Sequence, residues 1–597
     1  MRKSLLQFFL SLAAFLTFLA VFSAALQNDA FSRFAIVRLL LIGVGLVIWG
    51  AWALRLILSS RWIPLRLRDS LAAAQRFAGR VTRFLVFAPS SGLVLAGLML
   101  ACITVFSIWY ASLGLFPTFP RFDNLYVDQA EAFLHGQLAL LETPSPEILA
   151  LSDPYSYEQR SGVPYLWDAS LYNGRYYLYS GPVPAVILSA IMGFTKEPAP
   201  SSLLVLLSAV LIPVVLFFLL WGVQRHFYPH APVLSVGLFL FVASVNLPFL
   251  FLLGRGRMYE TSIITGQLFL LLGITGFFYF IILNRPGWLF LAGLGWGLAV
   301  ACRYNLALSI AVLAGAGLWV VWRRAQHGKA AVYRAAFMIV PLAVCAVGLG
   351  MYNWLRFDNP LETGLKYQLT TPVDQNRHFS PTYLQTSIYL NVLYPYRQQE
   401  SFPLIRSIAV VPDRAPEWVN YHPGKQNDET IFGLRLVPVL WLLVPLLVLQ
   451  GGLQWSKRGQ PELHRRPGFE DLAILRWATG IAGFLQFTVL LFYYYSAVRF
   501  MADYYLLLLL TIMFLLWQID SRIQQFRWPR VLLWGTAVLA VILTAIFGFL
   551  GGFDNPPRVF EVYNPAVEFQ IASAWDAVYT SPGMVGKVLR YLVILLL

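Results

Sequence analysis

The sequence predicts an all-α polytopic membrane protein, on three observations. Hydrophobic residues make up 58% of the 597 residues and charged residues only 12%, and the mean hydropathy is +0.64. A soluble chain of this length needs far more polar residues to cover its surface. The apolar segments are long enough for helices of about 20 residues, which cross a bilayer core, and too long for barrel strands. Finally, the basic residues gather in short loops between these segments.

The apolar segments predict about thirteen transmembrane helices. The first segment follows Arg2 and Lys3 but lacks a small-residue cleavage site, so we interpret it as an anchor rather than a signal peptide. The predicted spans are 5–26, 35–58, 88–113, 201–223, 232–253, 261–283, 287–302, 305–322, 335–352, 431–451, 473–495, 502–518 and 531–550.

Basic residues fix the predicted orientation. The loop 61–83 holds six arginines and one aspartate, and further Lys and Arg clusters follow the eighth, tenth and twelfth spans. With thirteen spans, all these loops fall on one side, which the positive-inside rule identifies as the cytoplasm. The N-terminus is then cytoplasmic and the C-terminus outside. The net charge of +15 reflects this pattern, so no nucleic-acid partner is expected.

Two predicted outer loops, 116–181 and 352–429, are too long to be simple connections. The first carries eight acidic residues against three arginines and is rich in Tyr and Trp, which suits a polar, aromatic-lined site at the membrane face. The chain has no P-loop, dinucleotide fingerprint, HExxH motif or paired CxxC, so ATP-driven, nicotinamide and classical zinc chemistry have no support. The three cysteines lie in or beside apolar segments and predict no disulfide framework.

An acidic motif opens the first outer loop. Asp123 can cap a short helix that ends at Gly136, and Asp128 and Glu131, three residues apart, share one face of it. A carboxylate just above the bilayer can act as a general base for an incoming hydroxyl. The alternative is that Asp123 only caps the helix and the other two are solvated.

A Tyr- and Pro-rich stretch precedes a short apolar segment that ends near Phe194. The segment is too short to span, so it should lie in the outer interface with the tyrosines as an anchor, and frame a groove. A purely structural interfacial helix is the alternative. The residues assigned to this groove are Glu131, Tyr176, Tyr177, Pro182, Pro184 and Glu260.

Several cations lie at the predicted outer face. A charge within the membrane costs roughly 2.5–3.5 kcal/mol, so an arginine at a helix break needs a partner. Guanidinium groups suit phosphate because they offer a fixed bidentate fork. The alternative is that these side chains reach headgroups or pair with Glu260 and Asp503. The candidate phosphate-binding residues are Arg255, Arg257, Arg303, Arg356, Lys366 and Arg499.

These features, in this order, resemble the GT-C superfamily of membrane glycosyltransferases, which includes protein O-mannosyltransferases and the aminoarabinose transferase of lipid A. The resemblance covers roughly 92–551 and rests on short motifs. The acidic motif at Asp123, the Pro182-Val-Pro184 helix start, the glycine-rich segment ending in Arg303 and the 352–364 segment, similar to uncharacterised bacterial members, carry it. The family's acidic pair is often Asp-Glu where this chain has Asp-Asn, and its proline pair is often adjacent, so the base and the groove stay open.

The resemblance implies a GT-C-like helical bundle at 88–550, a two-helix extension with a basic loop at 1–87 and an outer tail at 551–597. It implies transfer of a sugar from a polyprenyl-phosphate donor to a hydroxyl of a lipid, glycan or protein acceptor, at the outer face of a bacterial plasma membrane. Asp123 or Asp128 would take the proton, and Arg255, Arg257 or Arg303 would stabilise the leaving phosphate. No cofactor is predicted, and a divalent metal is not excluded.

Two other classes of protein are alternatives to the glycosyltransferase hypothesis. A transporter or lipid flippase usually places polar residues near the middle of broken spans, often within inverted repeats. Here the charges cluster at outer helix ends and no repeat is found, which favours an enzyme. A non-catalytic protein that binds envelope polymers would use the same aromatic loop but would not need arginines at the membrane face.

Overall fold

The structure is a computed structural model that describes residues 89–115, 119, 120, 122, 125–325, 328–370, 378–399, 401–407, 415–422, 425–427, 432–455, 467–554 and 558–580. The predicted spans 5–26 and 35–58, and the candidate base Asp123, lie outside the described residues.

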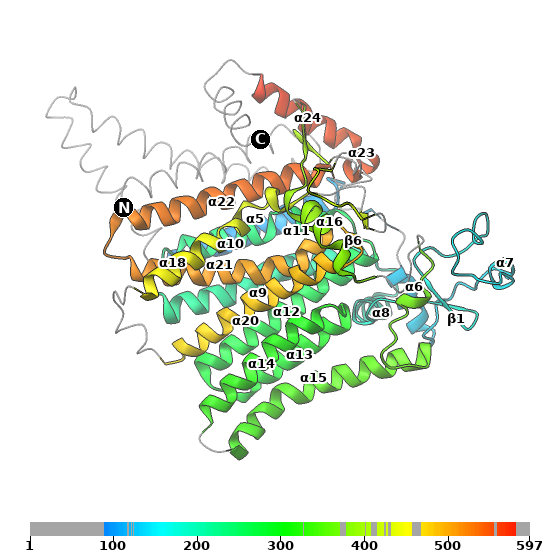
Figure 1. Cartoon of the computed structure of the whole chain (residues 1–597), viewed down its shortest axis with the longest axis horizontal. Helices are drawn as coiled ribbons and strands as arrows, with labels where there is room; N and C mark the ends of the chain where they lie inside the picture. The colour runs from blue at the N-terminus through cyan, green and yellow to red at the C-terminus, as the bar shows by residue number, and fades with distance from the viewer. Residues whose placement is uncertain are drawn as a thin grey trace.

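Long helices run side by side as one bundle (Figure 1). Each of the predicted spans from 88–113 onward coincides with one helix or with two adjacent ones. The helices are α5 (Pro89–Ala111), α9 (Ser201–Phe227), α10 (Leu234–Ser244), α11 (Leu247–Gly254), α12 (Met258–Leu283), α13 (Pro286–Cys302), α14 (Leu306–Arg324), α15 (Gly328–Phe357), α17 (Pro438–Trp441), α18 (Leu443–Trp455), α20 (Phe469–Phe492), α21 (Ala502–Arg522) and α22 (Arg527–Phe553).

Length and composition identify an integral membrane protein. Within the described residues, 7 helices are long and apolar enough to cross a bilayer, and the pair α10–α11, bent by 50°, makes up to 8. The shorter apolar helices include α13, whose described length is 17 residues. The total of about thirteen spans therefore stays a prediction.

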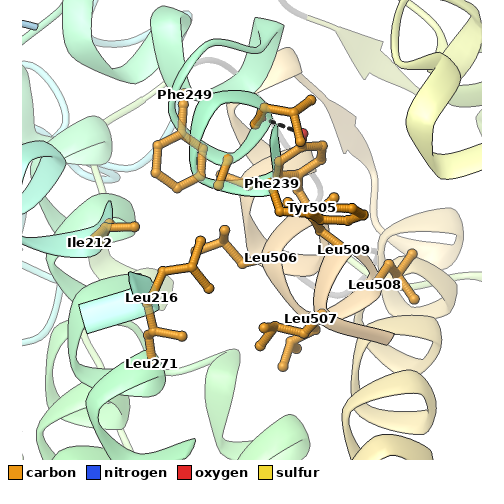
Figure 2. Close-up of a cluster of buried hydrophobic side chains, with 14 of the residues drawn as sticks. Ile212, Leu216, Phe239, Phe249, Leu271, Tyr505, Leu506, Leu507, Leu508 and Leu509 are labelled. Atoms are coloured by element: carbon orange, nitrogen blue, oxygen red, sulfur yellow. Dashed lines mark hydrogen bonds between the residues drawn. The ribbon is translucent and has the colours of Figure 1, made fainter. Parts of the chain in front are cut away.

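The core of the bundle is centred on α21. Every side chain from Ala502 to Asp520 is buried, because this helix is apolar on all sides and neighbours surround it. Figure 2 shows Leu506 and Leu507 of α21 facing Leu216 of α9 and Leu271 of α12.

Glycines allow close packing on both sides of α13. A side chain at Gly293 would collide with the main-chain carbonyl of Met338 on α15, and a side chain at Gly273 of α12 would collide with the ring of Trp296. Small residues at helix contacts let backbones approach closely in membranes. The glycine-rich segment noted in the sequence therefore holds α12, α13 and α15 together.

The segment predicted to be the first outer loop folds against one end of the bundle, which we call the loop end (the end at which α6 and α8 lie; Figure 1). It contains α6 (Leu125–Leu134), α7 (Pro146–Leu149), strands β1 (Ser170–Tyr172) and β2 (Arg175–Tyr177), and α8 (Val183–Thr195). The strands pair antiparallel through Asn173 and Gly174, both with positive φ, as a two-residue hairpin requires. At 13 residues, α8 is too short to span, as predicted.

The second outer loop packs on the first. Leu369 N donates to Ala169 O at 2.9 Å, and Asp168 N donates to Leu369 O at 3.0 Å. Its elements are η1 (Leu365–Tyr367), η3 (Pro381–Tyr383), α16 (Leu384–Ile388), η4 (Tyr389–Leu393), β3 (Arg397–Gln398), β4 (Ile405–Arg406) and β5 (Gln426–Asn427), and η6 (Leu434–Leu436) follows the loop. Near the loop end, β6 (Tyr495–Ser496) pairs with β5, followed by η7 (Val498–Met501); α23 (Val559–Tyr563) and α24 (Pro565–Tyr579) end the described chain.

Candidate functional site

A buried ion pair closes the break between α13 and α14 at the loop end. Arg303 follows the last residue of α13 and donates from Nε to Asp503 Oδ1 at 2.8 Å and from Nη2 to Asp503 Oδ2 at 2.7 Å. Asn305 Nδ2 adds a third bond to the same carboxylate at 2.9 Å. Asp503 lies in the first turn of α21 and is fully buried. The pair compensates the buried carboxylate with the partly buried arginine and engages two of the three guanidinium nitrogens.

A second arginine lies beside the first. Arg499 of η7 is 9% exposed, and its guanidinium carbon lies 4.5 Å from the centre of the Tyr259 ring. The guanidinium carbons of Arg499 and Arg303 each lie 5.5 Å from the centre of the Phe500 ring. Two candidates separated by almost 200 residues therefore meet around one phenylalanine, and both interact electrostatically with Tyr493.

Asp168 of the first outer loop completes this group. Tyr259 donates its hydroxyl to Asp168 Oδ2 at 3.0 Å, and Gln368 Nε2 donates to Oδ1 at 3.1 Å. Burial raises the pKa of the Asp168 carboxyl, while hydrogen bonds and the charge of Arg499 act in the opposite direction. We call Asp168, Tyr259, Arg303, Gln368, Arg499 and Asp503 the outer polar cluster.

A buried lysine borders the outer polar cluster. Lys425 is 4% exposed and donates from Nζ to the main-chain oxygen of Tyr493. Its Nζ lies 5.9 Å from the ring centre of Tyr383. Burial lowers the pKa of Lys425 to about 7, since an apolar environment disfavours the ammonium form.

The acidic motif is anchored beside the same helix end. Tyr126 of α6 donates its hydroxyl to Gly181 O at 3.1 Å. A Cβ at Gly181 would collide with the main-chain carbonyl of Ala301, two residues before Arg303. The junction of α6, α8 and α13 therefore places Asp128 and Glu131, both half-buried, on a helix fixed at the loop end.

The turn between α11 and α12 presents its two arginines differently. Arg255 is buried with its guanidinium 4.9 Å from the Phe251 ring centre, whereas Arg257 is exposed, 5.9 Å from the ring centre of Phe122, the residue before Asp123. Glu260 is 1% exposed, and its Oε2 has no hydrogen-bond donor among the described residues. Arg257 is thus the candidate cation beside the acidic motif.

Arg356 and Lys366 contribute to the support of the loops. Arg356 is buried at the end of α15 and donates to Leu178 O and, at 2.8 Å, to Asn353 Oδ1. Its guanidinium carbon lies 3.7 Å from the ring centre of Tyr352. Lys366 is exposed, with its Nζ 5.7 Å from the ring centre of Tyr367. The contacts of Arg356 tie α15 to the first outer loop.

Most of the proposed groove residues are buried in the structure. Tyr176 and Tyr177 of β2 are buried, and Tyr177 packs on Phe357 with ring centres 5.4 Å apart. They therefore fill the loop interior rather than face lipid. Pro182 is the residue before α8 and Pro184 is buried in its first turn, while the exposed apolar residues of α8 include Val186 and Phe194.

Asp168, Tyr259, Gln368 and Lys425 belong to the site region but were not singled out by the sequence. Each is a common residue in a long loop or at a helix start, with no motif around it. The one usable signal was the place of Asp168 in the acid-rich loop, five residues before the predictable Asn173-Gly174 turn. Among the described residues, no group of three His, Cys, Asp or Glu side chains is arranged to hold a metal ion.

Comparison with known proteins gives structural likeness only. No family model and no curated protein sequence matches the chain. It is similar to the apo oligosaccharyltransferase of Archaeoglobus fulgidus, at 10% identity over 83% of this chain and 59% of that chain, with a TM-score of 0.41. It is also similar to ArnT from Cupriavidus metallidurans bound to undecaprenyl phosphate, at 13% identity over 82% and 80% of the two chains, with a TM-score of 0.37. The chain thus spans 59% of the length of the archaeal enzyme.

Proposed function

We propose that this protein is a glycosyltransferase that moves a sugar from a polyprenyl-phosphate donor to an acceptor hydroxyl at the loop end. The observation that supports it most is the outer polar cluster, in which Arg303 and Arg499 flank Phe500 beside the Asp168 carboxylate. Buried arginines at a membrane face are costly and mark functional sites by default. The donor class is the one that the sequence resemblance implies.

The arginines suit the leaving phosphate. Arg303 binds Asp503 through Nε and Nη2, so its position is fixed while Nη1 lies outside that pair. Arg499 is oriented by the Tyr259 ring. Donors held in place beforehand stabilise charge that grows in the transition state without reorganising, which is usually the largest catalytic contribution.

The acceptor proton needs a carboxylate. Both oxygens of Asp168 already accept hydrogen bonds from Tyr259 and Gln368, so we assign Asp168 a positioning role. Asp123 or Asp128 remains the proposed base. As the acceptor hydroxyl attacks the anomeric carbon, its proton passes to that carboxylate, and the bond from the anomeric carbon to the phosphate oxygen breaks with its electrons on the phosphate.

The transporter alternative draws on one specific feature, the break between α10 and α11. Exposed main-chain groups at such a break can bind ions or substrate. Here Asn246 Nδ2 donates to Val242 O and Ala243 O, and its Oδ1 accepts from Phe249 N at 3.0 Å. A Cβ on Gly548 of α22 would collide with the Asn246 backbone. The break is filled and satisfied internally, which favours the enzyme.

Native mass spectrometry of the detergent-purified protein tests the donor site. We expect a co-purifying polyprenyl phosphate that is lost in Arg499→Gln and in Arg303→Lys, and retained in Arg175→Gln, an exposed arginine at the same end. A parallel Arg255→Ala with Arg257→Ala variant asks whether the α11–α12 turn contributes. Absence of such a lipid, or its retention in all variants, would count against the proposal.

Asp123→Asn and Asp128→Asn, each assayed for transfer from a polyprenyl-phosphate sugar, test the base. We expect one of them to lose turnover while keeping its lipid and its thermal stability. Full activity in both would exclude the acidic motif as the source of the base.

A further inference from the structure

Two arginines lie close together at the end of the bundle opposite the loop end. Arg476 is in the second turn of α20 and is 4% exposed, and Arg522 is the last residue of α21 and is partly buried. Among the described residues, neither side chain makes a hydrogen bond or an ion pair, and the Nε atom of each is buried without an acceptor. The guanidinium carbon of Arg476 lies 5.4 Å from the ring centre of Trp477. The two positive charges interact electrostatically.

The acidic residues on α20 and α21 at this end do not compensate them. There are three, and each is held by an arginine from elsewhere. The pairs are Arg323 with Glu470, Arg324 with Asp471 at 2.6 Å, and Arg530 with Asp520 at 2.6 Å. Arg476 and Arg522 are therefore two positive charges left over after the local ion pairs are formed.

The surroundings of Arg476 make this excess of positive charge unfavourable in free energy. Arg476 borders a crevice too narrow for a water molecule, lined also by Tyr228, Phe469, Leu472, Ala473 and Phe514. A charged side chain that water cannot reach gains a large electrostatic interaction energy when an anion approaches, because no hydration shell has to be removed from it. Tyr228 lines the same crevice as Arg476 and interacts electrostatically with both arginines, so its hydroxyl is a third potential donor.

We propose that Arg476, Arg522 and Tyr228 bind a phosphate group at the mouth of this crevice. Guanidinium groups bind phosphate oxygens through two parallel hydrogen bonds, and the phenol adds a third donor. The group can belong to a phospholipid headgroup or to a free phosphate. The crevice is at the opposite end of α21 from the outer polar cluster, so this site is independent of the proposed transfer reaction.

Lipid binding and thermal stability of the purified full-length protein test the site. In native mass spectrometry with phosphatidylglycerol, we expect Arg476→Gln and Arg522→Gln each to lower the bound fraction at least about fivefold, the loss of roughly 1 kcal/mol of binding. Arg285→Gln is the matched control, since Arg285 is an exposed arginine at the same end. Arg476→Lys keeps the charge and should keep part of the binding.

Titration of the wild type distinguishes the two sources. A rise in Tm with phosphatidylglycerol micelles but not with inorganic phosphate assigns the site to a headgroup, and a rise with both assigns it to small anions as well. Neither ligand raising the Tm of the wild type would overturn the proposal, even where a glutamine variant fails to fold. Equal stabilisation of Arg476→Gln and wild type would overturn it too.

Discussion

Arg303 and Asp503 join two helix ends that are 200 residues apart through paired hydrogen bonds of 2.8 and 2.7 Å. The pair fixes the break after α13 onto the start of α21, the most buried helix of the bundle. It thereby sets the position of Arg303, one of the two arginines proposed to bind the phosphate of the sugar donor.

Asp503→Asn should destabilise the protein strongly. Removing one partner of a buried pair leaves an uncompensated charge, at a cost of about 3–5 kcal/mol. The measurement is Tm in detergent against wild type. Arg303→Met combined with Asp503→Leu should recover most of the loss, because no charge stays buried. A double variant as unstable as the single one would show that the charges themselves are not the cause.

Lys425 should make stability depend on pH. Its pKa in the fold is about 7 and its ordinary value is 10.5. Between these values the unfolded chain binds more protons than the folded one, so the free energy of unfolding rises with pH across this window. We expect wild type to gain stability from pH 7 to 9.5 relative to Lys425→Met. Lys366→Met, an exposed lysine of the same outer loop, should leave the profile unchanged.

Tyr259→Phe should reduce glycosyl transfer without unfolding the protein. It removes the hydrogen bond to Asp168 but keeps the ring against Arg499. A hydrogen bond to a charged group contributes about 1.5–3 kcal/mol, so we expect kcat to fall about 10- to 100-fold. The readout is the split between kcat and KM. A change in KM alone would instead indicate a role in substrate binding.

Gly293→Ala should loosen the bundle. The added Cβ would collide with the Met338 carbonyl and push α15 away from α13. Core overpacking of this kind costs about 1–3 kcal/mol. Gly287→Ala on the same helix, where a Cβ meets nothing within 4 Å, is the control for the change in helix propensity. Equal Tm values for the two variants would contradict the packing argument.

The bundle could be predicted from the sequence because each membrane helix corresponds to one continuous apolar segment long enough to cross a bilayer. The short helix of the acidic motif and the short helix α8 were predictable for the same reason, since a glycine end and a proline start are local signals. Arg303 and Arg499 stood out because each charge interrupts an apolar context.

What brings these residues together was not predictable. Asp168 and Gln368 lie in two loops 200 residues apart, and no sequence pattern in either loop indicates the hydrogen bond between them. Tyr176 and Tyr177 show the reverse case. A tyrosine-rich stretch suits a membrane interface and a loop interior equally. Adjacent strand residues point to opposite faces, so both are buried only because the folded chain covers both faces of the hairpin.

The main-chain bonds between Ala169 and Leu369, and between Asp168 and Leu369, have a mechanical consequence. They join the two outer loops, so that one loop cannot move away from the other while these bonds are intact. Any opening at the loop end must move Asp168 and Gln368 together or break these bonds first. A reagent that crosslinks the two loops here should therefore leave turnover unchanged.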